Sequence, residues 1–325
     1  MSAFKLKILN PSEKVLRLSS AKYINKYNSV ELSDYESCLG VLEHDFNIEG
    51  IKAQIRMHYI KFDGNGMPMV KALANKLYEY IIDYCISSRN RSESLTTRQS
   101  AKLIKEARAL FRHPKISDES PDKTGEAGEM LLYFFMEAIL KAPQMVSKME
   151  LKTNHKDEIK GSDGIHARFD KDSGIVNFFF GESKLYKKSS AAISDAIKSI
   201  EQFHDIEMYQ HEFTMVNKHF KYADDATKDA ITSLIIGGEP GPNVCVNHAC
   251  LIGYDFKEFA ALSGYTPAEL QADFINKFHE DGARLTKLLQ SKFDSFSKKH
   301  LKFEVFFLPF PSVVEFRNAF NEALD

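Results

Sequence analysis

The sequence predicts an α/β fold, in which a mixed sheet flanked by helices is preceded by an N-terminal α+β region. Hydrophobic residues make up 43% and charged residues 27% of the 325-residue chain, a balance typical of globular proteins. From residue 125 onward, stretches with helical periodicity alternate with apolar stretches typical of strands. A loop at 114–123, rich in Ser, Asp and Pro, precedes this part. We therefore expect two regions, 1–120 and 121–325.

The N-terminal region is expected to contain a strand over 51–62, a helix over 69–86 and a second helix over 92–112. The polar side of the second helix carries a basic stripe that includes Arg98, Lys102 and Lys105. Such a stripe can contact DNA phosphates, or it can be the solvated side of a core helix. The region is thus our candidate for contacting DNA. It is also our candidate for docking a partner, because a basic block at 1–30 is followed by an acidic block at 31–50, although the two blocks could instead pair with each other.

The second region is expected to contain nine elements. In order they are a helix at 125–141, strands at 146–153, 161–170 and 175–183, helices at 190–205 and 223–236, a strand at 244–254, a helix at 266–296 and a strand at 302–308. The start of the long helix is well defined, because Thr266 and Glu269 form a capping box pattern around Pro267.

Two charged residues end a strongly apolar strand. Three phenylalanines and Gly181 lead directly into Glu182-Ser183-Lys184, and alternate strand residues point to the same side, so Glu182 and Lys184 share a face. Asp163 lies near the start of the preceding strand. Carboxylates from neighbouring strands can hold Mg²⁺, for which Mn²⁺ can substitute, and a nearby lysine can position the attacking water. The sequence therefore predicts phosphodiester hydrolysis, with Asp163 and Glu182 as metal ligands.

Two more carboxylates, Glu126 and Glu129, open the helix at 125–141. They lie three residues apart, so they share one helix face and either could complete the metal site, directly or through water. Both positions also favour acidic residues without any metal, because they lie near a helix N-terminus.

The order helix, three strands and helix, with Asp and then Glu-x-Lys on consecutive strands, resembles the PD-(D/E)xK core of restriction-endonuclease-like nucleases over residues 125–205. Gly125 and Glu129 resemble the Gly-x-x-x-Glu opening of several members, which favours Glu129 over Glu126. The resemblance implies that Glu129, Asp163, Glu182 and Lys184 form the catalytic set.

Three segments resemble the HamA family, the nuclease subunits of Hachiman anti-phage defence systems: 161–166, 180–187 and 306–311. This resemblance implies a DNase with little sequence preference that is held in check by a partner helicase of superfamily 2. The residues leave two alternatives open, namely a nuclease-fold subunit used only for docking, and an RNase or nickase on the same fold.

Several other residues carry weaker signals. Lys187 and Lys188 follow the Glu-x-Lys strand and could contact DNA phosphates at the mouth of the site. His166 is expected on the strand face opposite Asp163, and the spacing of Cys245, His248 and Cys250 argues against a zinc site. Gln202 and His204 are expected on a solvated helix face.

The composition also bears on where the protein resides in the cell and on how it could bind DNA. The four cysteines are scattered, the N-terminus lacks a signal-peptide core, and the most apolar stretch, 130–140, is too short to cross a bilayer. We therefore expect a cytoplasmic protein without a membrane partner. The formal net charge of −2 means that contacts with DNA must come from local basic patches.

Overall fold

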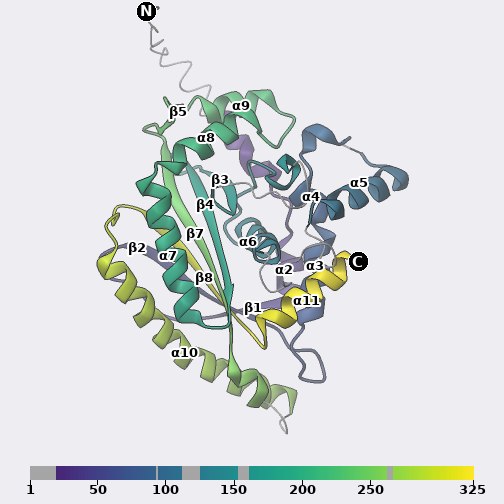
Figure 1. Cartoon of the computed structure of the whole chain (residues 1–325), viewed down its shortest axis with the longest axis vertical. Coiled ribbons are helices and arrows are strands. Elements are labelled where there is room, and N and C mark those ends of the chain that lie inside the picture. Colours follow the sequence, from purple (N-terminus) through teal and green to yellow (C-terminus); the bar gives the residue numbers. More distant parts are fainter. Residues whose placement is uncertain (1–19, 93, 112–124, 153–160, 262–265) are drawn as a thin grey trace, which may run out of the picture.

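The computed structural model describes residues 20–92, 94–111, 125–152, 161–261 and 266–325 (Figure 1). Its centre is a six-stranded sheet, in the order β1 (Leu39–Leu42), β2 (Lys52–Ile60), β8 (Lys302–Phe310), β7 (Val244–Asp255), β4 (Ile175–Tyr186) and β3 (Gly164–Asp170). The four central strands are parallel, and each edge strand is antiparallel to its neighbour. The predicted α/β fold with a mixed sheet is confirmed.

Helices cover both faces of this sheet (Figure 1). One layer is built around α6 (Glu126–Ala138) and includes α2 (Leu32–Cys38), α3 (Val70–Glu79), α4 (Ile81–Cys85), α5 (Thr97–Ala109) and α11 (Val313–Leu324). The opposite layer consists mainly of α7 (Ser189–Asp205), α10 (Pro267–Ser295), α8 (Met208–Lys218) and α9 (Asp225–Thr232). The short elements are η1 (Lys22–Tyr27), η2 (Ser88–Asn90), η4 (Met149–Leu151), η5 (Lys257–Ala261), β5 (Ile235–Ile236) and β6 (Glu239–Pro240).

The three phenylalanines of β4 are buried on both faces of the sheet. Phe178 and Phe180 pack with Phe213 on the side of α7 and α8, whereas Phe179 belongs to the cluster around α6. A central strand that is covered on both faces needs an apolar run rather than an alternating pattern. The same alternation places Glu182 and Lys184 on the α7 side and Ser183 on the α6 side.

The prediction of a strand at 146–153 is wrong for residues 146–152, the part that the structure describes. Residues 146–152 contain η4 instead, and the β-pairing nearest to them among the described residues is an isolated bridge between Gln144 and His166. Val146 and Met149 are buried by tertiary contacts, so their apolar character does not signal a strand. Residue 153 lies outside the described residues.

Other boundaries also differ from the expectation. The helix expected at 69–86 is split at Tyr80, whose backbone leaves the helical conformation. The helix expected at 223–236 is shorter, because β5 begins at Ile235, and α2, β1, α8 and α11 were not predicted. The capping box at Thr266 is confirmed, since its side chain accepts from the Glu269 amide while Glu269 accepts from the Thr266 amide.

The expected boundary between two regions, the loop at 114–123, lies outside the described residues. On either side of it the chain contributes to the same sheet, because β2 pairs in parallel with β8. α11 also packs against α3. Among the helices that the structure describes, none combines the length and the apolar character needed to cross a bilayer.

Candidate active site

The candidate site lies where the β3–β4 hairpin opens. β3 begins at Gly164, opposite Gly181, whereas β4 continues as far as Tyr186. The amide of Asp163 donates to the carbonyl of Gly181 at 2.8 Å, and the Asp163 carboxylate accepts from the Ser183 amide at 2.7 Å. A side chain thus replaces the missing strand partner, and this fixes the Asp163 carboxylate beside Glu182.

Glu182 and Lys184 lie on the β4 face that α7 covers, and the Lys184 Nζ is 2.6 Å from the Glu182 Oε1. Both side chains are largely buried, with 13% and 22% of their surface exposed, respectively. Together with Asp163 they line a pocket of about 330 Å³, whose other described lining residues are Gly161, Ser162, Phe180, Gly181, Ser199, Ile200, Gln202, Phe203, Ile206, Met208 and His248. The three residues are therefore both close together and accessible from one cavity.

Glu129 approaches Asp163 from the other layer. It lies on the first turn of α6, and its neighbour Gly128 packs so closely on β4 that a Cβ there would be 2.5 Å from the Ser183 Oγ. Glu126 is held in a buried ion pair with Lys152, with 2.6 Å between the Glu126 Oε1 and the Lys152 Nζ. The Tyr84 hydroxyl lies 3.5 Å from a Glu129 oxygen. Of the two helix carboxylates, Glu126 is thus the one committed to an ion pair.

Crowding of negative charge changes the protonation of this site. Burial, followed by the nearby Glu182 and Glu129, raises the pKa of Asp163 well above its ordinary value. Burial and Glu126 raise the pKa of Glu129 from 4.5 to about 7, although Lys152 and Lys148 oppose the rise. Burial alone would lower the pKa of Lys184, but Glu182 and Asp163 outweigh it and the pKa is raised. Lys184 is therefore an ammonium at neutral pH.

The described residues include no group of three or more His, Cys, Asp or Glu side chains placed to hold a metal ion. Asp163, immediately before β3, and Glu182, on the adjacent β4, offer carboxylate oxygens, and Mg²⁺ commonly takes one or two carboxylates and keeps several waters. This pair thus suits a hard, hydrated cation better than it suits zinc, which usually needs three or four protein ligands.

The HamA family model matches residues 36–324, nearly the whole chain. The chain belongs to the HamA family. The family resemblance of the segments at 161–166, 180–187 and 306–311 is therefore confirmed. HamA proteins are components of the Hachiman anti-phage defence system, so this chain is a defence-system component. No curated protein matches the chain.

The basic residues that the sequence suggests for DNA contact lie in two places on this HamA-family member. Arg98, Lys102 and Lys105 are exposed on α5, which packs on α4 in the layer around α6. Glu182 and Lys184 face the opposite layer, so the α5 stripe and the pocket lie on different sides of the sheet. Lys187 and Lys188 are exposed at the turn between β4 and α7, directly after the site strand.

Three histidines near the site, His166, His204 and His248, contact other parts of the protein. His166 is fully buried, its Nδ1 lies 2.7 Å from the carbonyl oxygen of Ala142, and burial lowers its pKa to about 3. His248 lines the pocket, and its Nε2 is 2.7 Å from the Nε2 of His204 on α7. Gln202 was expected on a solvated face; it is exposed, yet it also lines the pocket.

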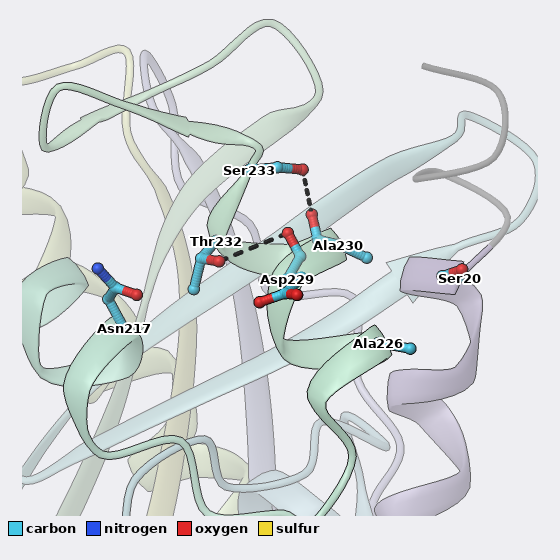
Figure 2. A pocket seen from close by; sticks show the side chains of 7 residues that line it. All are labelled: Ser20, Asn217, Ala226, Asp229, Ala230, Thr232 and Ser233. Carbon is cyan, nitrogen blue, oxygen red and sulfur yellow. Dashed lines mark hydrogen bonds between the residues drawn. The ribbon is translucent and has the colours of Figure 1, made fainter. Parts of the chain in front are cut away.

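A second pocket lies between α8, α9 and the start of the described chain (Figure 2). Asp229 is the only ionisable residue among its described lining residues. Figure 2 shows the hydroxyls of Thr232 and Ser233 turned toward backbone carbonyl oxygens, to which they donate at 3.4 Å and 2.8 Å. Since this pocket lacks a cluster of ionisable groups, the chemistry is better sought at Asp163 and Glu182.

Proposed function

We propose that this HamA-family chain is a metal-dependent nuclease of the PD-(D/E)xK type, which hydrolyses phosphodiester bonds of DNA. One observation carries the proposal. The hairpin opens so that the Asp163 carboxylate is fixed to the β4 backbone beside Glu182, with the Lys184 ammonium 2.6 Å from Glu182. Two neighbouring carboxylates with a lysine at the same pocket suit metal-assisted attack of water on a phosphodiester.

The residues fit Mg²⁺ for an electrostatic reason. The raised pKa of Asp163 reflects burial and two neighbouring carboxylates, and a bound divalent cation offsets that repulsion. Asp163 and Glu182 would hold the ion, and Mn²⁺ could replace it. When bound, the ion would polarise the phosphate and lower the pKa of a coordinated water.

The remaining groups have distinct roles in this proposal. Lys184 keeps its proton, so it can orient the attacking water and stabilise the negative charge that develops on the phosphate. Glu129, with a pKa of about 7, can accept or return a proton at neutral pH. The side chains of Lys184 and Glu129 are both largely buried, which favours a fixed geometry.

We infer DNA contacts that are mainly to the phosphate backbone, with little sequence preference. Lys187 and Lys188 are exposed next to the site and can contact phosphates. The α5 residues Arg98, Lys102 and Lys105 could bind DNA only along a path that reaches the other side of the sheet. Within the Hachiman system the partner would be a superfamily 2 helicase that restrains the nuclease in the cytoplasm, where the four free thiols stay reduced.

The test uses purified protein with and without the candidate helicase. Substrates are supercoiled plasmid, linear duplex, single-stranded DNA and RNA, each in Mg²⁺, Mn²⁺ and EDTA. Degradation of DNA that requires the metal supports the proposal. Faster degradation of RNA would point to an RNase, and accumulation of nicked circles alone would point to a nickase. Helicase binding without cleavage of any substrate would leave a docking subunit.

A further inference from the structure

The residue before Asp163, Ser162, is held by a buried ion pair from elsewhere in the chain. Glu212 on α8 is fully buried, and its Oε1 lies 2.8 Å from the Nζ of Lys148, whose side chain is 12% exposed. Enclosing a charge pair costs free energy unless the pair makes further hydrogen bonds. The further hydrogen bonds of this pair therefore indicate which part of the chain it holds in place.

Within the part of the chain that the structure describes, the further hydrogen bonds of this pair are all made with Ser162. The Glu212 Oε1 accepts from the Ser162 amide at 2.6 Å and from the Ser162 hydroxyl at 3.1 Å. The Lys148 Nζ donates to the Ser162 carbonyl at 2.7 Å. The backbone amide, the backbone carbonyl and the side chain of one residue are thus fixed by two charged groups. We call Glu212 and Lys148 the Ser162 clamp.

Gly161 makes this approach possible. Its φ of +119° is unfavourable for residues with a side chain, and a Cβ there would be 2.0 Å from the Glu212 Oε1 and 3.0 Å from the Lys148 Nζ. The clamp can therefore reach the backbone only because glycine stands immediately before Ser162.

We propose that the Ser162 clamp positions the Asp163 carboxylate for metal binding, an inference that rests on the function proposed above for this site. Asp163 follows Ser162 directly, so the clamp fixes its backbone, while the Ser183 amide fixes its carboxylate. With both ends held, the carboxylate stays beside Glu182 despite their mutual repulsion. Glu212 and Lys148 are positioning residues, because they act through Ser162.

The primary variant is Glu212→Gln, which keeps an oxygen acceptor and removes the charge. We expect the dissociation constant for Mn²⁺, measured by calorimetry, to rise about 10- to 100-fold, as is typical when a group that orients a metal ligand is changed. Exchange of the Ser183 amide, followed by NMR on protein labelled with ¹⁵N-serine without metal, should also become faster. The slower cleavage expected alongside is a third readout.

The matched control is Glu137→Gln. Glu137 is also a fully buried carboxylate with backbone donors, the amides of Ser29 at 2.6 Å and Gln144 at 3.0 Å. It should lower stability without changing Mn²⁺ affinity or the exchange of the Ser183 amide. Lys148→Met is the second variant if Glu212→Gln does not fold, and it is second because Lys148 also acts on the pKa of Glu129. Combining both changes should weaken Mn²⁺ binding by less than the sum of the two single losses in binding free energy, since both changes remove the same interaction.

The outcomes separate this inference from the proposed function. If Glu212→Gln leaves both the Mn²⁺ affinity and the Ser183 amide exchange like those of Glu137→Gln, the clamp is only structural and the inference fails. If the parent protein binds no Mn²⁺ at all, the proposed function fails. The exchange rate of the Ser183 amide then still tests whether the clamp positions Asp163. Faster exchange in Glu212→Gln than in Glu137→Gln would support positioning of Asp163, and equal exchange would overturn it.

Discussion

The protonation of Glu129 leads to a prediction about stability. Burial and Glu126 raise its pKa from 4.5 to about 7 in the folded protein. A carboxyl group with a raised pKa contributes stability that is fully present below the unfolded pKa and is lost as the pH rises through the folded pKa. Glutamine is neutral at every pH. We therefore expect Glu129→Gln to be more stable than the parent above neutral pH.

The size of the effect follows from the two pKa values. At about 1.36 kcal/mol per unit of pKa, a rise from 4.5 to about 7 corresponds to about 3.4 kcal/mol at most. Because the neighbouring carboxylates titrate together, we expect a gain of about 1–3 kcal/mol near pH 8 and less than about 1 kcal/mol near pH 5, which lies just above the unfolded pKa. The gain should appear between these two pH values.

Urea unfolding in EDTA near pH 5 and near pH 8 measures this difference. The matched control is Glu126→Gln, which breaks the buried ion pair with Lys152 and should destabilise the protein near pH 8. A Glu129→Gln protein that is no more stable than the parent at either pH would refute the reasoning about charge crowding at this site.

Two further predictions concern packing and DNA binding. Gly128→Ala should lower the free energy of unfolding by about 1–3 kcal/mol, because its Cβ would be 2.5 Å from the Ser183 Oγ. Adding Ser183→Ala should restore part of the loss in urea unfolding, because the added Cβ would still be 3.2 Å from the Leu185 Cγ. No loss in the single variant would contradict the close approach. Replacing Lys187 and Lys188 by alanine should reduce the slope of log affinity against log salt by about 1.8 for duplex DNA. Fluorescence anisotropy measures that slope, and an unchanged slope would exclude these lysines as phosphate contacts.

The hairpin of the site could be predicted well from the sequence. The apolar run before Glu182 and the periodicity after Ser189 are local signals, and β4 and α7 match them closely at their starts. The placement of Glu182 and Lys184 on one face needs only strand alternation. What alternation could not indicate is that the Asp163 carboxylate takes the place of a strand partner for Ser183.

Tertiary contacts explain what the sequence did not indicate. The apolar residues Val146 and Met149 resemble a strand, yet they are buried by neighbouring elements without a ladder. Glu212 and Lys148 are 50 and 14 residues from Ser162, so no local pattern could link them to it. The glycine before Ser162 was the only nearby sign that something approaches the backbone closely.

The most direct test of the central claim is single-turnover degradation of plasmid DNA in Mg²⁺ by the parent protein and by Glu182→Ala and Lys184→Ala. The matched control is Glu304→Ala, which removes a partly buried carboxylate paired with Arg56 elsewhere in the sheet. We expect the cleavage rate to fall about 100- to 1,000-fold in both site variants and to change little in the control. Equal rates in all four proteins would contradict a catalytic site at Asp163, Glu182 and Lys184.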